Sequence, residues 1–451
     1  MSKTSTPIAA IILAAGKGTR MKSSLPKVMH TVAGMPMVGH VVSRALEVDA
    51  APIALVVAPG MDQVVQVGRD MAGDVDVAIQ KEQLGTGHAV LAAKQACTNF
   101  DGIMLVLYGD TPLISADTLR RLIDAVEDDA KCAVAVLGFT PDDPGAYGRL
   151  VEADDGTLER IVEAKDASDD ELAIELCNSG VMALRAPLAW KLLEKIDNKN
   201  ANHEYYLTDV VALAKTMGYH AVAVEGDEDE VLGVNSRSEL ATAEAIFQFR
   251  ARQTHMNNGA TLVDPDSVFF AADTKIGRDV LIEPNVFFGP GVSIGDGAHI
   301  KAFSHIEGAT IGKDTFVGPF ARLRPGSNLG DDVHVGNFVE VKSSVIGVGT
   351  KIRHLSYIGD STIGEQTNIG AGTITCNYDG YNKHKTVIGR EVFVGSNSLL
   401  IAPVAIGDGA MVAAGSVITE NIAADALAIG RTKPEQKEDW AKTFRAKQKK
   451  K

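Results

Sequence analysis

The chain has 451 residues, enough for two or three domains, and its 45% hydrophobic and 23% charged residues are typical of a globular protein. A formal net charge of −14 argues against a nucleic-acid partner. The four cysteines are scattered and no apolar run is long enough to span a membrane, so we expect reduced thiols and a cytoplasmic protein with no membrane partner.

Residues 1–234 alternate apolar runs with stretches of helical pattern. The apolar runs are Ile8–Leu13, Ile53–Val57, Val75–Ile79, Ile103–Leu107 and Ala133–Leu137. The helical stretches include Met37–Val48, Thr86–Ala96 and Ser115–Val126. This alternation predicts an α/β domain with a mostly parallel, buried sheet, in which ligands bind beyond the carboxyl ends of the strands.

A glycine-rich segment, Leu-Ala-Ala-Gly-Lys-Gly-Thr-Arg over residues 13–20, follows the first apolar run. Its backbone N–H groups, together with Lys17, Arg20 and Lys27, suit phosphate binding. The alternative is a plain tight turn with surface cations. Asp110 stands just past another apolar run, where its carboxylate can serve a metal ion or only cap a helix.

A helical connector is predicted next, because Ser236 and Glu239 have the spacing of a capping box. We assign residues 235–256 to this linker and residues 257–451 to a second domain with a C-terminal tail. A short helix near Trp440 is expected in that tail.

From residue 276 to residue 418 an apolar, mostly aliphatic residue returns every sixth position, with one-residue slips and one insertion. Of 23 such positions, 14 are followed directly by glycine. This period fits neither a helix nor a hairpin, and it predicts a parallel β-helix whose coils each take about three hexads. The insertion Cys376–Val387 breaks the repeat and is expected to close over a ligand or a neighbouring subunit.

The repeat places specific residues on adjacent coils. Arg324 and Lys342 each follow an inward aliphatic residue and are 18 residues apart, so both should point outward on neighbouring coils. Strands about 4.8 Å apart would hold two cations unfavourably close unless an anion lies between them. That anion is either Glu340 or Asp331, or a substrate phosphate. Ser396 and Ala414 are also 18 apart, and such a line of small residues could hold a thin acyl-pantetheine arm or simply fit the turns.

Several motifs occur together and in order. They are Gln80 to Gly87, Tyr108-Gly109-Asp110, Asn178-Ser-Gly, Gly233-Val-Asn235-Ser-Arg237, Arg322-Leu-Arg324-Pro-Gly and Cys376-Asn377-Tyr378-Asp379-Gly380. With the hexad repeat, they make residues 8–440 resemble the family of bacterial bifunctional N-acetylglucosamine-1-phosphate uridyltransferases / glucosamine-1-phosphate acetyltransferases. The resemblance implies a Rossmann-like nucleotidyltransferase domain followed by a left-handed parallel β-helix of hexapeptide repeats.

For the first domain, the resemblance implies uridylyl transfer from UTP to N-acetylglucosamine 1-phosphate, with Mg²⁺ held by Asp110 and Asn235. Arg20 and Lys27 would neutralise charge and position the phosphates. The residues that match the nucleotide or UDP-sugar site are Leu13, Ala14, Ala15, Gly16, Lys27, Gln80, Gly85, Thr86, Tyr108, Gly109 and Asp110, with Gly148, Glu163, Asn178 and Asn235 on the sugar side.

For the β-helix, the resemblance implies transfer of an acetyl group from acetyl-CoA to glucosamine 1-phosphate. His354 matches the general base, which suits a reaction in which an amine must attack as the neutral species. Glu340 is a candidate to orient its imidazole. The sugar-phosphate residues would be Arg324, Lys342, Tyr357 and Asn368. The acetyl-CoA residues would be Ala371, Asn377, Tyr378, Ser396, Ala414 and Arg431.

Proteins that this chain resembles are homotrimers whose acetyl-transfer sites lie between subunits. Two alternatives remain. One is a single-activity sugar-nucleotide pyrophosphorylase whose β-helix only assembles or regulates the enzyme. The other is a non-catalytic scaffold that has kept the fold. The presence of His354, Lys342, Arg324 and the Asn377-Tyr378 pair argues against the first, and intact Arg20, Lys27, Asp110 and Asn235 argue against the second.

Overall fold

The computed structural model describes residues 6–200 and 202–449, and the chain divides into two compact units, Met1–Arg250 and Ala251–Lys451. The division falls inside helix α8 (Arg237–Asn257), which covers most of the segment predicted to be a linker. The predicted capping box is confirmed. The Glu239 amide donates to Ser236 Oγ at 3.2 Å, and the Ser236 amide donates to Glu239 Oε2 at 2.9 Å.

The first unit is built on a nine-stranded sheet. Its order is β5 (Asp76–Ile79), β4 (Ile53–Val57), β1 (Ile8–Leu13), β6 (Ile103–Tyr108), β10 (Cys177–Arg185), β7 (Cys132–Phe139), β11 (His220–Glu225), β9 (Leu158–Val162) and β8 (Arg149–Glu152). Neighbours among β5, β4, β1 and β6 are parallel, as are β7 and β11, whereas β10 runs antiparallel between β6 and β7. The apolar runs predicted β1, β4, β5, β6 and β7. Strands β8, β9, β10 and β11 were not predicted, because their residues form no continuous apolar run along their full length.

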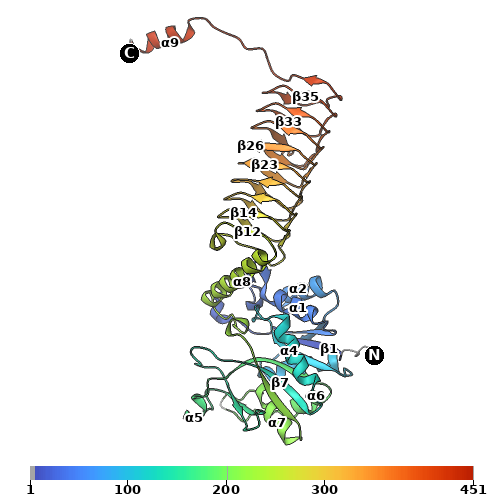
Figure 1. Ribbon diagram of the computed structural model, residues 1–451, viewed down its shortest axis with the longest axis vertical. Coiled ribbons are helices and arrows are strands. Elements are labelled where there is room, and N and C mark those ends of the chain that lie inside the picture. Colours follow the sequence, from blue (N-terminus) through green and yellow to red (C-terminus); the bar gives the residue numbers. More distant parts are fainter. Residues whose placement is uncertain (1–5, 201, 450–451) are drawn as a thin grey trace. The chain divides into compact units, whose positions relative to one another are not determined.

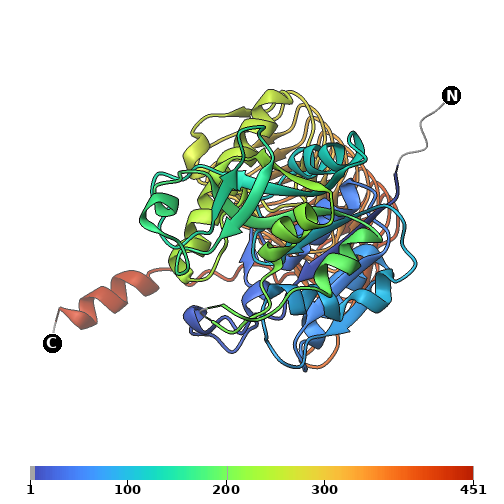
Figure 2. The ribbon, with the colours of Figure 1, turned by 90° about the horizontal axis from the view of Figure 1, so that it is seen from below.

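Helices cover both faces of this sheet (Figure 2). One face carries α1 (Met37–Glu47), α2 (Asp62–Ala72) and α4 (Ala116–Glu127). The other carries α3 (Thr86–Ala92), α6 (Leu188–Leu193) and α7 (Val210–Thr216). Ile11 and Ile12 of β1 are both fully buried yet belong to different cores, since successive strand residues point to opposite faces. Helix α3 ends earlier than predicted, because the chain tightens into a 3₁₀ helix at Lys94–Cys97.

The second unit is a parallel β-helix, as predicted, and its coils stack from β12 to β35 in Figure 1. The first sheet contains β12 (Thr261–Leu262), β14 (Leu281–Ile282), β17 (His299–Ile300), β20 (Phe316–Val317), β23 (His334–Asn337), β26 (Lys351–His354), β29 (Asn368–Ile369), β32 (Phe393–Val394), β35 (Met411–Val412) and β37 (Leu427–Ala428). The second contains β13 (Lys275–Ile276), β16 (Ser293–Ile294), β19 (Ala309–Ile311), β22 (Ser327–Leu329), β25 (Val345–Ile346), β28 (Ser361–Ile363), β31 (Thr386–Ile388) and β34 (Val404–Ile406). The third contains β15 (Phe287–Phe288), β18 (His305–Ile306), β21 (Arg322–Leu323), β24 (Glu340–Lys342), β27 (Tyr357–Gly359), β30 (Ile374–Cys376), β33 (Leu399–Ile401) and β36 (Val417–Ile418).

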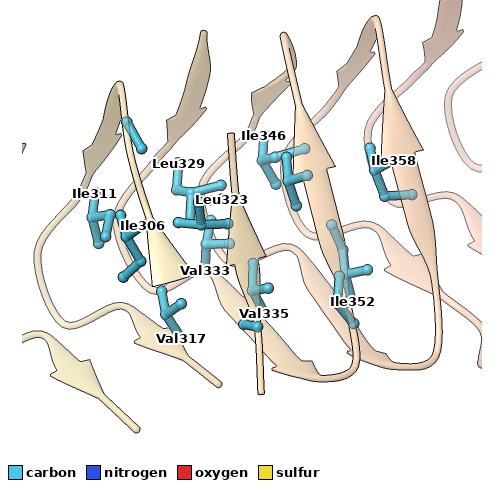
Figure 3. Packing of buried hydrophobic residues seen from close by; sticks show 14 of the residues in the cluster. Ile306, Ile311, Val317, Leu323, Leu329, Val333, Val335, Ile346, Ile352 and Ile358 are labelled. Carbon is cyan, nitrogen blue, oxygen red and sulfur yellow. The ribbon is translucent and has the colours of Figure 1, made fainter. Parts of the chain in front are cut away.

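The hexad column forms the core of this unit. All of its positions are buried except Ile276, which is partly buried. Figure 3 shows part of this column, including Val317, Leu323 and Val335, gathered inside the coils. The last coil extends beyond residue 418, where the hexad repeat ends, because β37 pairs with β35. Helix α9 (Trp440–Gln448) lies in the tail, as predicted. Within the described residues, no helix is long and apolar enough to cross a membrane.

One corner of the β-helix carries a column of exposed apolar side chains, which we call the aromatic ladder. It consists of Phe303, Phe320, Phe338 and Leu355, which are 53%, 46%, 55% and 60% exposed. The rings stack with centroids 4.9 Å and 5.2 Å apart. All four residues have positive φ angles, between 52° and 60°, which bulky side chains rarely adopt.

Candidate active sites

A pocket of about 350 Å³ lies at the carboxyl ends of β1 and β6 in the first unit. Ten residues predicted from the resemblance line it: Leu13, Ala14, Ala15, Gly16, Lys27, Gln80, Gly85, Thr86, Tyr108 and Asp110. Val28, Gln83, Ala89 and Glu204 also line it and were not assigned to the site beforehand. Gln83 could have been found from its place inside the Gln80–Gly87 motif, since its amide donates to the Ala15 carbonyl.

The glycine-rich segment passes very close to Lys27. Gly18 has φ 59°, and a Cβ atom there would lie 2.6 Å from the Lys27 Cβ. Only glycine fits both this conformation and this approach. The Gly109 amide donates to the Leu13 carbonyl at 2.9 Å, which fixes the segment before Asp110 against the end of β1. Arg20, in the 3₁₀ helix Thr19–Met21, is exposed and does not line the pocket.

The two predicted metal ligands point their oxygens at the same cation. Lys27 Nζ donates to Asp110 Oδ2 and, at 2.9 Å, to Asn235 Oδ1. The Val234 amide donates to the Asp110 carbonyl at 2.9 Å, which holds the two segments together. The Lys27 and Asp110 side chains are only 12% and 17% exposed, so each charge depends on its partner.

This arrangement fits Mg²⁺ by the chemistry of its donors, because two oxygens already converge on one positive charge. Mg²⁺ prefers oxygen ligands and commonly completes its octahedron with phosphates and water. Among the described residues, no cluster of three or more His, Cys, Asp or Glu side chains could hold a metal ion alone.

The predicted sugar-side residues come together beside this pocket. The backbone amide of Asn178 on β10 donates to the Gly148 carbonyl at 2.8 Å. A Cβ atom on Gly148 would lie 3.6 Å from Glu163 Oε1. Burial, with the nearby charges of Asp166, Asp209 and Glu204, raises the pKa of Glu163. Burial also raises the pKa of Tyr108, and the carboxylates of Asp110 and Glu163 raise it further. A Cβ atom on Gly180, two residues after Asn178, would lie 2.8 Å from the Tyr108 ring, so Tyr108 lines the pocket and also borders the sugar-side segment.

In the second unit, His354 stands at the end of β26 beside Asn337 of β23. Its Nδ1 atom lies 2.7 Å from Asn337 Oδ1. Both residues line a pocket of about 380 Å³, together with Lys301, His334 and Arg353. That Glu340 orients the imidazole stays a prediction, because the side-chain contact that the structure shows for His354 is with Asn337. Glu340 lies on a different sheet and pairs with Arg324 at 2.9 Å.

Arg324 and Lys342 lie on adjacent coils, as predicted, since the Arg324 amide donates to the Val341 carbonyl at 2.9 Å. Each cation has a carboxylate partner. Lys342 Nζ lies 3.2 Å from Asp360 Oδ1. Arg324 lies 2.9 Å from Glu340 Oε1. Glu340, one of the predicted anions, pairs with Arg324. A second carboxylate, Asp360, pairs with Lys342 and was not predicted.

Asn377 closes this group from the insertion. Its amide donates to Asp360 Oδ2 and lies 3.5 Å from the Tyr357 hydroxyl. Contact with Lys383 and the Asp360 carboxylate raises the pKa of Lys342, whereas Lys342 lowers the pKa of Lys383. An additional anion beside Lys342 and Lys383 would stabilise both as ammonium ions.

The remaining residues of the predicted acetyl-CoA set form a line. Ala371, Ser396 and Ala414 occupy equivalent positions on three successive coils, following β29, β32 and β35. The Asn397 amide donates to the Ala371 carbonyl at 2.7 Å and the Gly415 amide to the Ser396 carbonyl at 2.8 Å. Asn368 is half-buried on β29, whereas Tyr378 and Arg431 are exposed.

Comparisons with known proteins agree with this two-part architecture. Residues 10–169 match the family model of the MobA-like NTP transferase domain. Residues 273–308 and 308–343 match the bacterial transferase hexapeptide (six repeats), and residues 385–420 match the hexapeptide repeat of succinyl-transferase. The bifunctional protein GlmU of Paramagnetospirillum magneticum is 54% identical over 98% of this chain and 98% of its own length.

The chain belongs to the bifunctional GlmU family. GlmU proteins of Zymomonas mobilis and Rhodospirillum rubrum are 50% and 53% identical over 99% and 98% of this chain, and over 99% and 98% of their own lengths. The GlmU family places a nucleotidyltransferase unit before a left-handed β-helix of hexapeptide repeats, and the predicted fold class is thereby confirmed. The match spans both units, so neither has been replaced by an unrelated domain.

Proposed function

We propose that this protein makes UDP-N-acetylglucosamine in two steps. The β-helix transfers the acetyl group of acetyl-CoA to glucosamine 1-phosphate. The first unit then transfers UMP from UTP to N-acetylglucosamine 1-phosphate and releases pyrophosphate. The product is a precursor of bacterial cell wall and lipopolysaccharide. The observation that carries the proposal is the near full-length similarity to relatives named bifunctional, with both candidate sites on one chain.

In the uridyltransferase step, a phosphate oxygen of the sugar attacks the α-phosphate of UTP and pyrophosphate leaves. The attacking oxygen is already anionic, so the main barrier is repulsion between anions and their alignment. Lys27 provides positive charge inside the pocket, and the backbone amides of the glycine-rich segment are suited to the phosphates. Arg20 is exposed at the start of the 3₁₀ helix and would have to reach the phosphates from outside the pocket wall.

Asp110 and Asn235 are proposed to hold Mg²⁺, which would supply further charge neutralisation to the phosphates when bound. Lys27 now contacts both oxygens, so its ammonium group would move from them to the phosphates. Gln80, Gly85, Thr86 and the segment 13–16 would hold the nucleotide. Gly148, Glu163 and Asn178 would hold the sugar.

In the acetyl-transfer step, the neutral amine of glucosamine 1-phosphate attacks the thioester carbon. A nitrogen–carbon bond forms, the carbon–sulfur bond breaks, and coenzyme A leaves as the thiolate. His354 accepts the proton that the amine loses. Arg324 and Lys342 would bind the sugar phosphate with Tyr357 and Asn368. The line of small residues, with Asn377, Tyr378 and Arg431, would hold acetyl-CoA.

We also propose that the protein is a homotrimer. The aromatic ladder supports a subunit interface, because three stacked rings and Leu355, all half-exposed and with strained backbone, favour a covering partner on this corner. Leu355 directly follows His354, and Phe338 directly follows Asn337. A second subunit packed on the ladder would therefore lie beside the acetyl-transfer site.

The test supplies purified protein with glucosamine 1-phosphate, acetyl-CoA, UTP and Mg²⁺, and follows free thiol and pyrophosphate separately. We expect both products, and we expect pyrophosphate to require acetyl-CoA when only the unacetylated sugar is supplied. Pyrophosphate without thiol release would instead identify a single-activity pyrophosphorylase whose β-helix is a scaffold.

A further inference from the structure

We propose that Asn337 is a positioning residue for acetyl transfer, which accepts a hydrogen bond from His354 Nδ1–H and so leaves Nε2 as the basic atom. The inference rests on the proposed function, in which His354 is the general base. It adds a residue that neither the sequence motifs nor the resemblance singled out.

The first observation is geometric. Asn337 Oδ1 and His354 Nδ1 are 2.7 Å apart, which is a short, well-formed hydrogen bond. The backbone enforces it, since Asn337 and His354 are register partners at the ends of the parallel strands β23 and β26. The next residues, Phe338 and Leu355, continue the aromatic ladder. The two side chains therefore start from neighbouring, fixed backbone positions.

The second observation is chemical. A neutral imidazole carries one N–H donor and one acceptor nitrogen, and the partner of one nitrogen decides which of them is protonated. An amide oxygen facing Nδ1 selects the tautomer with a proton on Nδ1 and a lone pair on Nε2. Both residues line the same pocket of about 380 Å³, so the base lies where a substrate can reach it.

The charges around the pocket make an amide a suitable partner. Lys301, Arg353 and His334 line it, and His334 lies 3.4 Å from Asp332 Oδ1. On the following coil β29 presents the neutral Asn368. None of the pocket-lining residues is a carboxylate, so Asn337 orients the imidazole without adding a negative charge that would favour its protonated form.

The experiment compares Asn337→Ala, Asn337→Asp and His354→Ala in the full-length protein, with Asn328→Ala as the matched control. Asn328 is exposed on β22, which belongs to a different sheet from β23 and β26 and lies outside the proposed site. We expect Asn337→Ala to lower kcat for acetyl transfer about 10- to 100-fold, with KM for acetyl-CoA within about threefold, because only orientation of the base is lost. Uridyl transfer and the control should be unchanged.

Asn337→Asp separates positioning from a structural role. The carboxylate still accepts from Nδ1–H, so acetyl transfer should recover to within about tenfold of the native rate. It also stabilises the protonated imidazole, so the acidic limb of the pH–rate profile should move to higher pH. In ¹⁵N-histidine spectra, the signal that disappears in His354→Ala belongs to His354. In the native protein, that signal should be typical of a tautomer with its proton on Nδ1.

Three results would overturn the inference. They are native acetyl transfer in Asn337→Ala, no recovery in Asn337→Asp, or an Nε2–H tautomer for His354, in which the Asn337 amide donates to Nδ1. Native acetyl transfer in His354→Ala would instead overturn the proposed role of His354 itself, so the two failures are distinguishable.

Discussion

At the scale of single residues, the first site is organised by one buried ammonium group. Lys27 Nζ contacts both Asp110 and Asn235, which are separated from it by 83 and 208 positions in the chain. A buried charge is costly unless it is paired, so removing one member changes the electrostatics of the other two. The site therefore responds to substitution as a unit.

Asp110→Ala should lower pyrophosphate formation at least about 100-fold, because the proposed metal loses a ligand and Lys27 loses its anionic partner. Acetyl transfer should be unchanged, as measured by thiol release from the same preparation. Asp74→Ala, an exposed carboxylate before β5, is the matched control. Near-normal uridyl transfer in Asp110→Ala would contradict the metal assignment.

Asp209 should make stability depend on pH. Burial, with the charges of Asp197 and Asp166, raises its pKa from the ordinary 3.8 to about 6. The folded protein holds this proton more tightly than the unfolded chain. The contribution to the free energy of unfolding is therefore complete below about pH 4 and is lost as the pH rises through about 6.

Asp209→Asn removes this loss. Urea unfolding should show the variant gaining stability relative to the native protein between pH 5 and pH 8, whereas the exposed Asp74→Asn should show no such change. If the free energies of unfolding of Asp209→Asn and the native protein differ by the same amount at pH 5 and at pH 8, the pKa of Asp209 is not raised.

At the scale of elements, the strands of the two units differ in how many of their residues are buried. Strand β1 is buried on both faces, so it shows as an unbroken apolar run. The short β-helix strands bury only the residue that points inward, so their signal is one apolar residue per hexad. The two units therefore leave two distinct patterns in the sequence.

The hexad column should be sensitive to small deletions. Val317→Ala removes two buried methyl groups from a fully buried position and should cost about 2 kcal/mol of the free energy of unfolding. Val345→Ala makes the same change where the side chain is 50% exposed, and should cost less than about 0.5 kcal/mol. Urea unfolding followed by circular dichroism would compare them, and equal losses would contradict the inward and outward assignment.

At the scale of the whole molecule, the proposed subunit interface lies next to the proposed acetyl-transfer site. The aromatic ladder continues directly from Asn337 and His354, so any subunit that covers the ladder also borders the base. The pocket proposed for uridyl transfer is lined by residues of the first unit.

Phe320→Ser should therefore weaken the trimer and lower acetyl transfer at least about tenfold, since one stacked ring is lost from the middle of the ladder. Uridyl transfer should persist. Light scattering coupled to size exclusion would measure the oligomer, with Phe249→Ser, an exposed ring on α8, as control. An intact trimer with full acetyl transfer would remove the ladder from the interface.

The sequence by itself determined the features that depend on local pattern. The hexad period predicted the β-helix and its inward column, the apolar runs predicted all the parallel strands of the first unit except β11, and Ser236 with Glu239 predicted the start of α8. The resemblance supplied ten residues that line one pocket. These features were predictable because a repeated burial requirement leaves a repeated mark on the chain.

Only the tertiary structure decided which side chains meet. Asn337 lies beside His354 because a one-residue slip shortens that coil to 17 residues, whereas a spacing of 18 would have placed Gly336 there. Within this chain, Glu340 belongs to a different sheet from His354 and pairs with Arg324. Lys27 contacts Asn235 although the two residues are 208 positions apart in the chain. Such contacts depend on register and on side-chain direction, which hydrophobic periodicity does not encode.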